Sequence, residues 1–415
     1  MIFQSLLGIF VIFFLAWMTS ENRHGFPYKI VFFAAILQAG LAILLFNVEI
    51  FRVFFSYLNR IVTALEESTM AGATFAFGYL GGGPAPFEVT HPEAVYILAF
   101  RGLLLLLVIS ALSSLLFYWK ILPLVVRGFS AILEKALKIG GAEGLAVSSN
   151  IFLGMVEAPL LIRPYLVAMT RSELFTVMTC GMATIAGTMM ILYASILGDI
   201  LPGALGHILT ASIINAPAAV AISKIIIPET EPLTPGKISD PDPASNFMDA
   251  ISKGTMRGIS LLLNITAMLV VLIALVKLAN ITLGVLPDFF GGALTLERIL
   301  GLLMTPLVWL MGVPLSESLV AGDLLGTKII LNELVAYLKM SQLPAGALSE
   351  RSITIMAYGM CGFANLGSLG IMIGGIGTMV EERRSEIVSL GFKSLLAGTL
   401  ATCLTGTIVG ILVLW

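Results

Sequence analysis

The sequence is poor in charge. Of its 415 residues 12% are charged, about half the share found in an average soluble domain, and 58% are hydrophobic. This balance argues against a soluble globular protein. Because the apolar runs are continuous instead of alternating with polar residues, they also argue against a membrane β-barrel. A formal net charge of −2 provides no basic surface for nucleic acid, so no nucleic-acid partner is expected.

Cysteine and catalytic motifs are scarce as well. The three cysteines, Cys180, Cys361 and Cys403, lie in apolar segments without the spacing of a metal site, so they are expected to be buried thiols. No motif pairs metal ligands or places a nucleophile beside a base, and no repeated filter sequence suggests a channel pore. The sequence therefore favours neither an enzyme nor a channel.

What the chain does have is long apolar segments, several of them able to cross about 30 Å of hydrocarbon. They predict an all-α polytopic membrane protein. The first segment is expected to be retained as a helix because no basic residues precede it. We expect eight transmembrane helices, at about residues 2–18, 29–47, 94–118, 173–193, 205–226, 258–285, 352–380 and 386–414.

Two further apolar stretches, 141–163 and 303–340, are interrupted by prolines and polar side chains. The first contains Asn150, Gly154, Glu157 and Pro159, and the second contains Pro306, Pro314, Glu317, Asp323, Asn332 and Glu333. Lys and Arg gather on the cytoplasmic side of membrane proteins. Their placement fits two re-entrant hairpins, the first entering from the cytoplasm and the second from outside. Ten full spans would instead leave six basic residues outside: Arg163, Arg171, Lys224, Lys237, Lys253 and Arg257.

The same rule sets the orientation of the chain. The residues before the first span carry no charge, whereas the loop after it holds Arg23 and Lys29. We expect both termini outside and the basic cluster 381–384 in the cytoplasm, in a multi-pass protein of the cell inner (plasma) membrane. Segment 119–140 alternates basic and apolar faces at helical spacing, which is typical of a helix in the cytoplasmic interface. A short soluble connector helix is the alternative for this segment.

A short motif occurs twice. Residues 180–187 read CGMATIAG and residues 361–368 read CGFANLGS, and each follows an Arg-Ser pair and one of the interrupted hairpins. Such a unit, entering once from each face, predicts an inverted-repeat transporter whose site lies at mid-membrane between the two broken units. Glycine and small polar residues inside a span free backbone groups that lipid cannot satisfy, so they are tolerated around a cavity.

Two carboxylates, Glu157 and Glu333, are set most deeply in apolar sequence. Each would cost about 2.5–3.5 kcal/mol at the centre of a bilayer. We therefore expect both to face the polar cavity; a structural hydrogen bond to a loose helix end is the alternative for each. Milder polar residues of the interrupted segments are expected to line the same cavity: Asn150, Thr184, Asn365 and Ser368.

Four motifs, taken in order, resemble the concentrative nucleoside transporter family over nearly the full length of the chain. They are G-x-x-E-A-P at 154–159, ATIAG at 183–187, NELVAY at 332–337 and CGFANLGS at 361–368. The resemblance implies a sodium-coupled symporter that imports nucleosides by an elevator-like movement, as a homotrimer in the lipid bilayer. It implies scaffold helices in 1–118 and 258–285, an interfacial helix in 119–140, a cytoplasmic loop in 227–257, and transport-domain repeats in 141–226 and 295–415.

The resemblance also implies roles for individual residues. Glu333, Asn365 and Ser368 match positions that hold the ribose hydroxyls, and Phe363 matches a ring beside the substrate. The remaining matches to the substrate site are Gly154, Met155, Val156 and Glu157 at the first hairpin tip, and Met189. For sodium, the matching ligands are the side chains of Asn150 and Thr184 and the backbone carbonyls of Leu153 and Ile185. No organic cofactor is implied.

Two points stay open. The oxygen donors of Asn150 and Thr184 suit a hard cation, which favours sodium over proton coupling. A proton-coupled carrier of nucleosides or another small polar solute, with Glu157 or Glu333 titrating, is the alternative. The family commonly has Gln and Thr or Ser where this chain has Met155 and Val156, and a smaller apolar residue at Met189. Because base-reading hydrogen bonds are lost, base preference cannot be transferred from the family.

Overall fold

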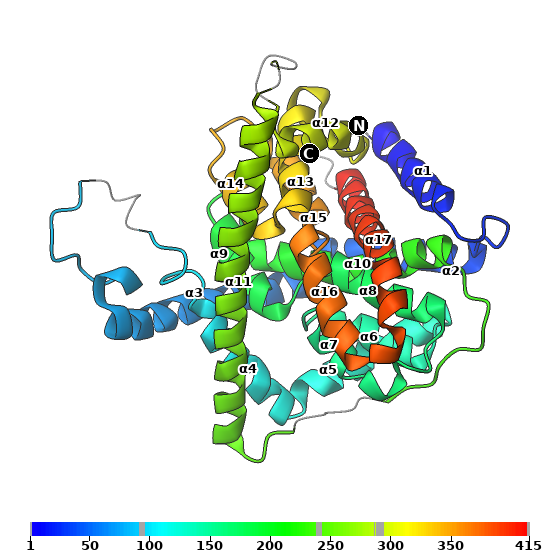
Figure 1. The fold of residues 1–415 in the computed structure, drawn as a ribbon, viewed down its shortest axis with the longest axis horizontal. Helices are drawn as coiled ribbons and strands as arrows, with labels where there is room; N and C mark the ends of the chain where they lie inside the picture. The colour runs from blue at the N-terminus through cyan, green and yellow to red at the C-terminus, as the bar shows by residue number, and fades with distance from the viewer. Residues whose placement is uncertain (1, 91–95, 238–242, 286, 288–293, 413–415) are drawn as a thin grey trace.

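The computed structural model describes residues 2–90, 96–237, 243–285, 287 and 294–412, and within them every regular element is helical (Figure 1). The α-helices are α1 (Ile2–Met18), α2 (Tyr28–Asn47), α3 (Glu49–Phe77), α4 (Leu105–Tyr118), α5 (Ile121–Leu137), α6 (Gly141–Asn150), α7 (Glu157–Leu160), α8 (Arg171–Ala183), α9 (Gly187–Leu197), α10 (Ala204–Ile226), α11 (Phe247–Leu283), α12 (Leu296–Leu310), α13 (Leu315–Ile330), α14 (Glu333–Ser341), α15 (Glu350–Gly359), α16 (Leu366–Met379) and α17 (Arg384–Leu412).

The predicted spans map onto α1, α2, α4, α8–α9, α10, α11, α15–α16 and α17, and the polytopic helical fold is confirmed. Within the described ranges, α2, α8–α9, α10, α11 and α17 are long and apolar enough to cross a membrane, and α1 and α16 are shorter apolar helices. The third span differs from its prediction, 94–118, because regular helix begins only at Leu105; residues 91–95 lie outside the described part. At its other end, Lys120 has a φ of 62°, and α5 leaves α4 at an angle of 74°.

The second interrupted stretch differs from the predicted single hairpin over 303–340. Gly312, with a φ of 109°, and Pro314 separate α12 from α13, so the first part of the stretch belongs to a separate helix. The hairpin is α13 and α14, with its tip at Leu331 and Asn332. Helix α12 then corresponds in order to α5. Each repeat consists of one such helix, a hairpin, a broken helix and a long helix: α5, α6–α7, α8–α9 and α10 in the first, and α12, α13–α14, α15–α16 and α17 in the second.

The two hairpins open at opposite ends of the molecule, as predicted. At the open end of the first, the Ala142 amide donates to the Thr234 carbonyl at 3.2 Å. The loop after α1 lies near the same end, where the Glu21 amide donates to the Ile226 carbonyl at 2.8 Å. The open end of the second hairpin lies beside the start of α1 and the end of α17 (Figure 1), and the Arg351 guanidinium there donates to the Gly312 and Gly410 carbonyls.

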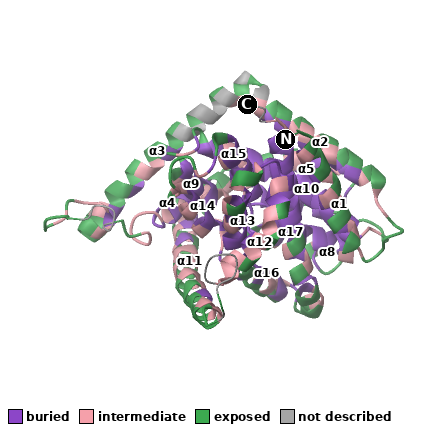
Figure 2. Cartoon of the chain, turned by 90° about the horizontal axis from the view of Figure 1, so that it is seen from above, coloured by how far each residue is buried: buried purple, intermediate pink, exposed green. Residues whose placement is uncertain are grey.

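Helices α10 and α17 form the buried centre, whereas α11 stands outside it. In the most apolar 18-residue stretch of α10, 89% of the residues are buried, whereas in that of α11 only 6% are buried. Figure 2 shows α11 as a mostly exposed and half-buried helix at the side of the buried core. It packs closely on α4, because a Cβ at Gly254 or Gly258 would lie 2.7 or 2.8 Å from a backbone atom of α4. Helices α4 and α11 therefore form a wall beside the core.

A group of charges joins the loop after α1 to the core. The Glu21 carboxylate accepts hydrogen bonds from Arg171 of α8 at 2.9 Å and from Lys393 of α17 at 2.7 Å. These bonds, the one from Arg171 foremost, lower the pKa of Glu21 to about 2.

The Glu21→Gln variant is expected to lower the stability of the folded protein by about 1 kcal/mol at pH 7, a value discounted because the pair is partly exposed. A carboxyl whose folded pKa lies below its unfolded value of about 4.3 stabilises the fold above that value. The contribution is lost as the pH falls toward 2. Thermal unfolding in detergent should therefore separate Glu21→Gln from the wild type at pH 7 but progressively less below pH 4. Equal unfolding midpoints at pH 7 would contradict this role of Glu21.

Candidate functional site

The breaks in the two repeats surround one cavity of about 660 Å³. Four helices begin at this cavity: the short α7 and the half-helices α9, α14 and α16. The residues that immediately precede them, Val156, Ala186, Asn332 and Asn365, all line it. Since the N-terminus of a helix carries partial positive charge, the ends of α9, α14 and α16 favour carboxylates and oxygen-rich ligands there.

The structure brings all the predicted substrate-site residues to this cavity. They come from the first hairpin tip, α9, the second hairpin tip and the break before α16: Gly154, Met155, Val156, Glu157, Met189, Glu333, Phe363, Asn365 and Ser368. Their assignment to a substrate stays a prediction. Glu157 and Glu333 are equivalent in position, because each is the first residue of the returning helix of its hairpin.

Glu333 lies at the centre of a buried hydrogen-bond network. One carboxylate oxygen accepts from the Tyr193 hydroxyl at 2.6 Å, and the other accepts from the Asn365 side-chain amide at 2.9 Å. The Asn365 side-chain oxygen in turn caps α16 by accepting from the Ser368 amide at 2.7 Å. Glu333 is 3% exposed. This network fixes a carboxylate and an amide side by side at the edge of the cavity.

Tyr193 and Lys328 lie at or near the site but are not among the residues predicted from the sequence. Tyr193 is one turn after Met189 on α9 and was hidden in an apolar run. Lys328 is fully buried on α13, and its ammonium has no hydrogen-bond partner in the part of the chain that the structure describes. Glu333 is a carboxylate close enough to interact electrostatically with this ammonium. Lys328 could have been predicted from the sequence, because it is a cation inside the same interrupted apolar stretch as Glu333.

One face of α11 was missed as well. Arg257, Ser260 and Asn264 line the cavity from the wall opposite the half-helices. Their spacing, 257, 260 and 264, is that of one helix face, so a polar stripe in the sixth span was readable in the sequence. The high mean hydropathy of this span, on which its prediction rests, hides a narrow polar stripe.

The predicted sodium ligands lie in the first repeat, where the break after α6 meets the break between α8 and α9. The Gly187 amide donates to the Phe152 carbonyl at 2.8 Å and holds the two breaks together. Asn150 is fully buried; its side-chain nitrogen donates to the Ala146 carbonyl, and its side-chain oxygen has no hydrogen-bond partner in the described part. An unsatisfied buried oxygen is costly, so it suits a cation.

The other predicted ligands are compatible with the same cation. The Thr184 hydroxyl donates to the Cys180 carbonyl at 2.8 Å, which leaves its lone pairs available. The carbonyls of Leu153 and Ile185 accept no hydrogen bond from the described residues. Amide, hydroxyl and carbonyl oxygens are the donors that hard cations prefer. The residues therefore fit a sodium ion, which would be cargo and not a resident cofactor. Among the described residues no cluster of His, Cys, Asp and Glu could hold another metal.

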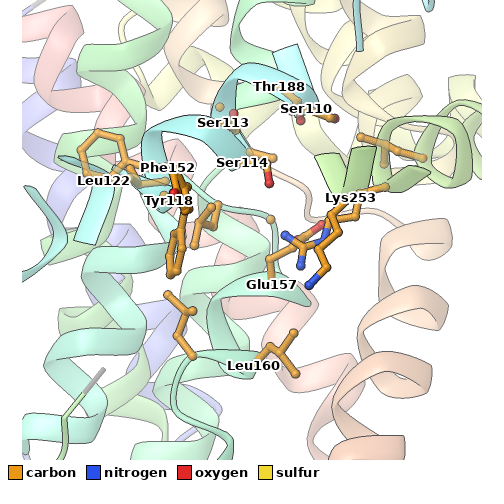
Figure 3. Close-up of a pocket in the computed structure, with 18 of the residues that line it drawn as sticks. Ser110, Ser113, Ser114, Tyr118, Leu122, Phe152, Glu157, Leu160, Thr188 and Lys253 are labelled. Carbon is orange, nitrogen blue, oxygen red and sulfur yellow. The ribbon is translucent and has the colours of Figure 1, made fainter. Parts of the chain in front are cut away.

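A second, smaller pocket of about 170 Å³ adjoins the cavity and shares Gly154, Glu157 and Arg257 with it. It lies where α4 ends and α11 begins. Figure 3 shows Glu157 and Lys253 extending into it from opposite walls, with the three serines of α4 near its top. Polar side chains thus continue from the cavity toward the end of the molecule that holds the loop 227–237.

Three family models match the chain: "Na+ dependent nucleoside transporter N-terminus" over 7–80, "Nucleoside recognition" over 99–200 and "Na+ dependent nucleoside transporter C-terminus" over 207–410. The chain is 34% identical to the nucleoside permease NupC of Helicobacter pylori over 100% of this chain and 99% of that protein. It is 36% identical to an uncharacterised transporter, YutK, of Bacillus subtilis, over 98% of each.

Solved structures agree. The fold is similar to that of CNTnw in an inward-facing substrate-bound state, with a TM-score of 0.87 and 31% identity over 99% of this chain and 98% of that one. A doubly substituted CNTnw in an outward-facing state gives a TM-score of 0.88 at 31% identity, over 99% and 97%. The relatives are transporters and permeases, which confirms the prediction that the chain is not an enzyme.

Proposed function

The chain belongs to the family of Na+ dependent, concentrative nucleoside transporters, and we propose that it imports nucleosides across the inner membrane together with sodium ions. The observation that carries this proposal is the pair of Glu333 and Asn365, buried side by side between two half-helix ends. A carboxylate accepts from a ribose diol while an amide both donates and accepts. We assign the ribose to Glu333, Asn365 and Ser368, and the ring of Phe363 to a face of the substrate.

Sodium is assigned to Asn150, Thr184 and the carbonyls of Leu153 and Ile185. The unsatisfied oxygen of buried Asn150 supports the assignment. Because the Gly187 amide bonds to the Phe152 carbonyl beside the ion site, and Gly187 begins the half-helix that carries Met189, an ion there would order the substrate side of the cavity. One sodium ion moving down about 100 mV gains about 2.3 kcal/mol from the potential alone, enough to drive uptake of a neutral solute.

Transport would proceed by an elevator-like movement of segments 141–226 and 295–415, which hold the hairpins, broken helices and long helices of the two repeats, against a scaffold that includes α4 and α11. Contacts between helices refine the expected division, which places all of 1–118 in the scaffold. The Gln38 side chain of α2 donates to the Thr405 hydroxyl of α17 at 2.9 Å, and Ser5 of α1 donates to the Met311 carbonyl at 3.2 Å. We therefore propose that α1 and α2 move with the repeats.

The orientation with both termini outside, and assembly into a homotrimer through scaffold helices, complete the proposal. The loop after α1 and the start of α17, both predicted to be cytoplasmic, are joined through Arg171, which pairs with Glu21 at 2.9 Å and with Glu386 at 3.3 Å. The exposed apolar side chains of α11, such as Leu263 and Val270, are available to lipid or to another protomer.

Uptake by purified protein in proteoliposomes tests the coupling ion. An inward sodium gradient without a pH gradient should drive accumulation of radiolabelled nucleoside, because the donor set of Asn150 and Thr184 suits sodium. A pH gradient without sodium should not. Accumulation driven by protons alone would favour the alternative, a proton-coupled carrier in which Glu157 or Glu333 titrates. No accumulation under either gradient would contradict both.

A further inference from the structure

The register of α11 places its polar residues over a defined part of the cavity. At one end, Arg257 and Leu261 line both the cavity and the smaller pocket, together with the first hairpin tip. At the other end, Leu272 packs close to Gly367, since a Cβ on that glycine would lie 2.9 Å from a methyl of Leu272. Gly367 is beside Asn365, the proposed ribose residue. Positions 260 and 264 therefore lie between the hairpin tip and the ribose-binding end, where a nucleobase would extend.

The hairpin tip itself offers little to a base. Met155 packs with its Cβ against Gly181, where a Cβ would approach within 2.9 Å, and the methyls of Val156 pack against Gly375. Neither side chain can form a hydrogen bond to a base edge. Glu157 is the polar side chain at this tip; it lies at the border of the cavity and extends into the smaller pocket beside Lys253 (Figure 3).

Asn264 and Ser260 supply the hydrogen-bonding groups that the first hairpin tip lacks. Both line the cavity and are exposed to it. Neither side chain is bonded to another residue of the described chain, whereas Arg257 is already engaged within the protein. An asparagine amide presents a donor and an acceptor side by side, and a serine hydroxyl can act as either. Every nucleobase carries adjacent donors and acceptors along its polar edge.

We propose that Asn264, assisted by Ser260, recognises the edge of the nucleobase, so that base discrimination in this chain resides on α11 and not on the first hairpin. The inference rests on the proposed function, because it requires a nucleoside in the cavity. It also implies that the two ends of the substrate are held by different bodies, the ribose by the mobile repeats and the base by the scaffold. The contact between the base and α11 then forms only in those conformations in which the mobile repeats face this part of α11.

Equilibrium binding of a panel of uridine, cytidine, adenosine, inosine and guanosine to purified protein in sodium tests the proposal. The wild type should bind these nucleosides with a ranked set of affinities. In Asn264→Ala the affinity for the best ligand should fall about 10- to 100-fold, as expected for one or two lost hydrogen bonds, and the ranking should flatten. Ser260→Ala should show a smaller change in the same direction.

Thr266→Ala is the matched control on α11. Its hydroxyl donates to the Leu262 carbonyl at 2.8 Å, and it does not line the cavity, so the ranking should persist. Unchanged affinities in Asn264→Ala, or an equal loss for every nucleoside with the ranking preserved, would overturn the assignment of base recognition to α11. A wild type that binds none of the nucleosides would refute the proposed function itself, and this inference with it.

Discussion

Glu333→Ala is expected to abolish nucleoside uptake. The side chain is 3% exposed and accepts from Tyr193 and Asn365, so its removal takes away the ribose acceptor and leaves two buried donors unsatisfied. Two hydrogen bonds to a charged group contribute about 3–6 kcal/mol together, which corresponds to a loss of roughly 10²–10⁴-fold in affinity. Sodium-driven uptake in proteoliposomes and equilibrium binding measure the loss.

Folding must be separated from binding in this experiment. Asn365→Ala should give a similar loss of uptake, because it removes the amide partner from the same site. Glu317→Ala is the matched control: it removes a carboxylate from the same hairpin, at the outer start of α13, where it accepts from Ser349. All three variants should elute from a sizing column as the wild type does. Full transport by Glu333→Ala and Asn365→Ala would remove the assigned ribose site.

Asn150→Ala is expected to remove the stimulation of nucleoside binding by sodium. Asn150 is fully buried, and its side-chain oxygen has no hydrogen-bond partner in the described part of the chain, so it is available to an ion. We expect the sodium concentration for half-maximal stimulation to rise about 10-fold or more, as for the loss of one charge-assisted contact of about 1.5–3 kcal/mol. Titration of nucleoside binding with sodium at constant ionic strength measures this shift.

Ser149→Ala provides the neighbouring control on α6. Its hydroxyl is buried and donates to the Leu145 carbonyl at 2.6 Å, as an ordinary intrahelical bond. Loss of that hydroxyl should leave the sodium dependence unchanged. A wild-type sodium dependence in Asn150→Ala, with the ion still required, would place the cation elsewhere.

The sequence alone predicts those parts of the site whose residues have a high free-energy cost in a membrane. Glu157 and Glu333 are expensive in hydrocarbon, and the paired motifs around Thr184 and Asn365 break their spans in the same way, so their meeting at one cavity was predictable. The opposite entry of the two hairpins followed from the placement of Lys and Arg. These features depend on local composition and on charge, which a single sequence displays.

Other features depend on packing that no local pattern displays. The limits of the second hairpin were predicted too broadly because α12 and α13 are both apolar, and their separation depends on the positive φ of Gly312. Tyr193 joins the site through a contact 140 residues away in the chain. The polar face of α11 can be assigned to the cavity only when the structure shows that this helix lies opposite the half-helices.

On the proposed function, the broken helices form one site for a nucleoside and sodium together. Calorimetric titration of purified wild-type protein with nucleosides, once in sodium and once with choline in its place, tests it most directly. We expect saturable nucleoside binding in sodium that weakens strongly in choline and is absent from Glu333→Ala in either salt. Nucleoside binding of equal strength in both salts, retained in Glu333→Ala, would contradict it.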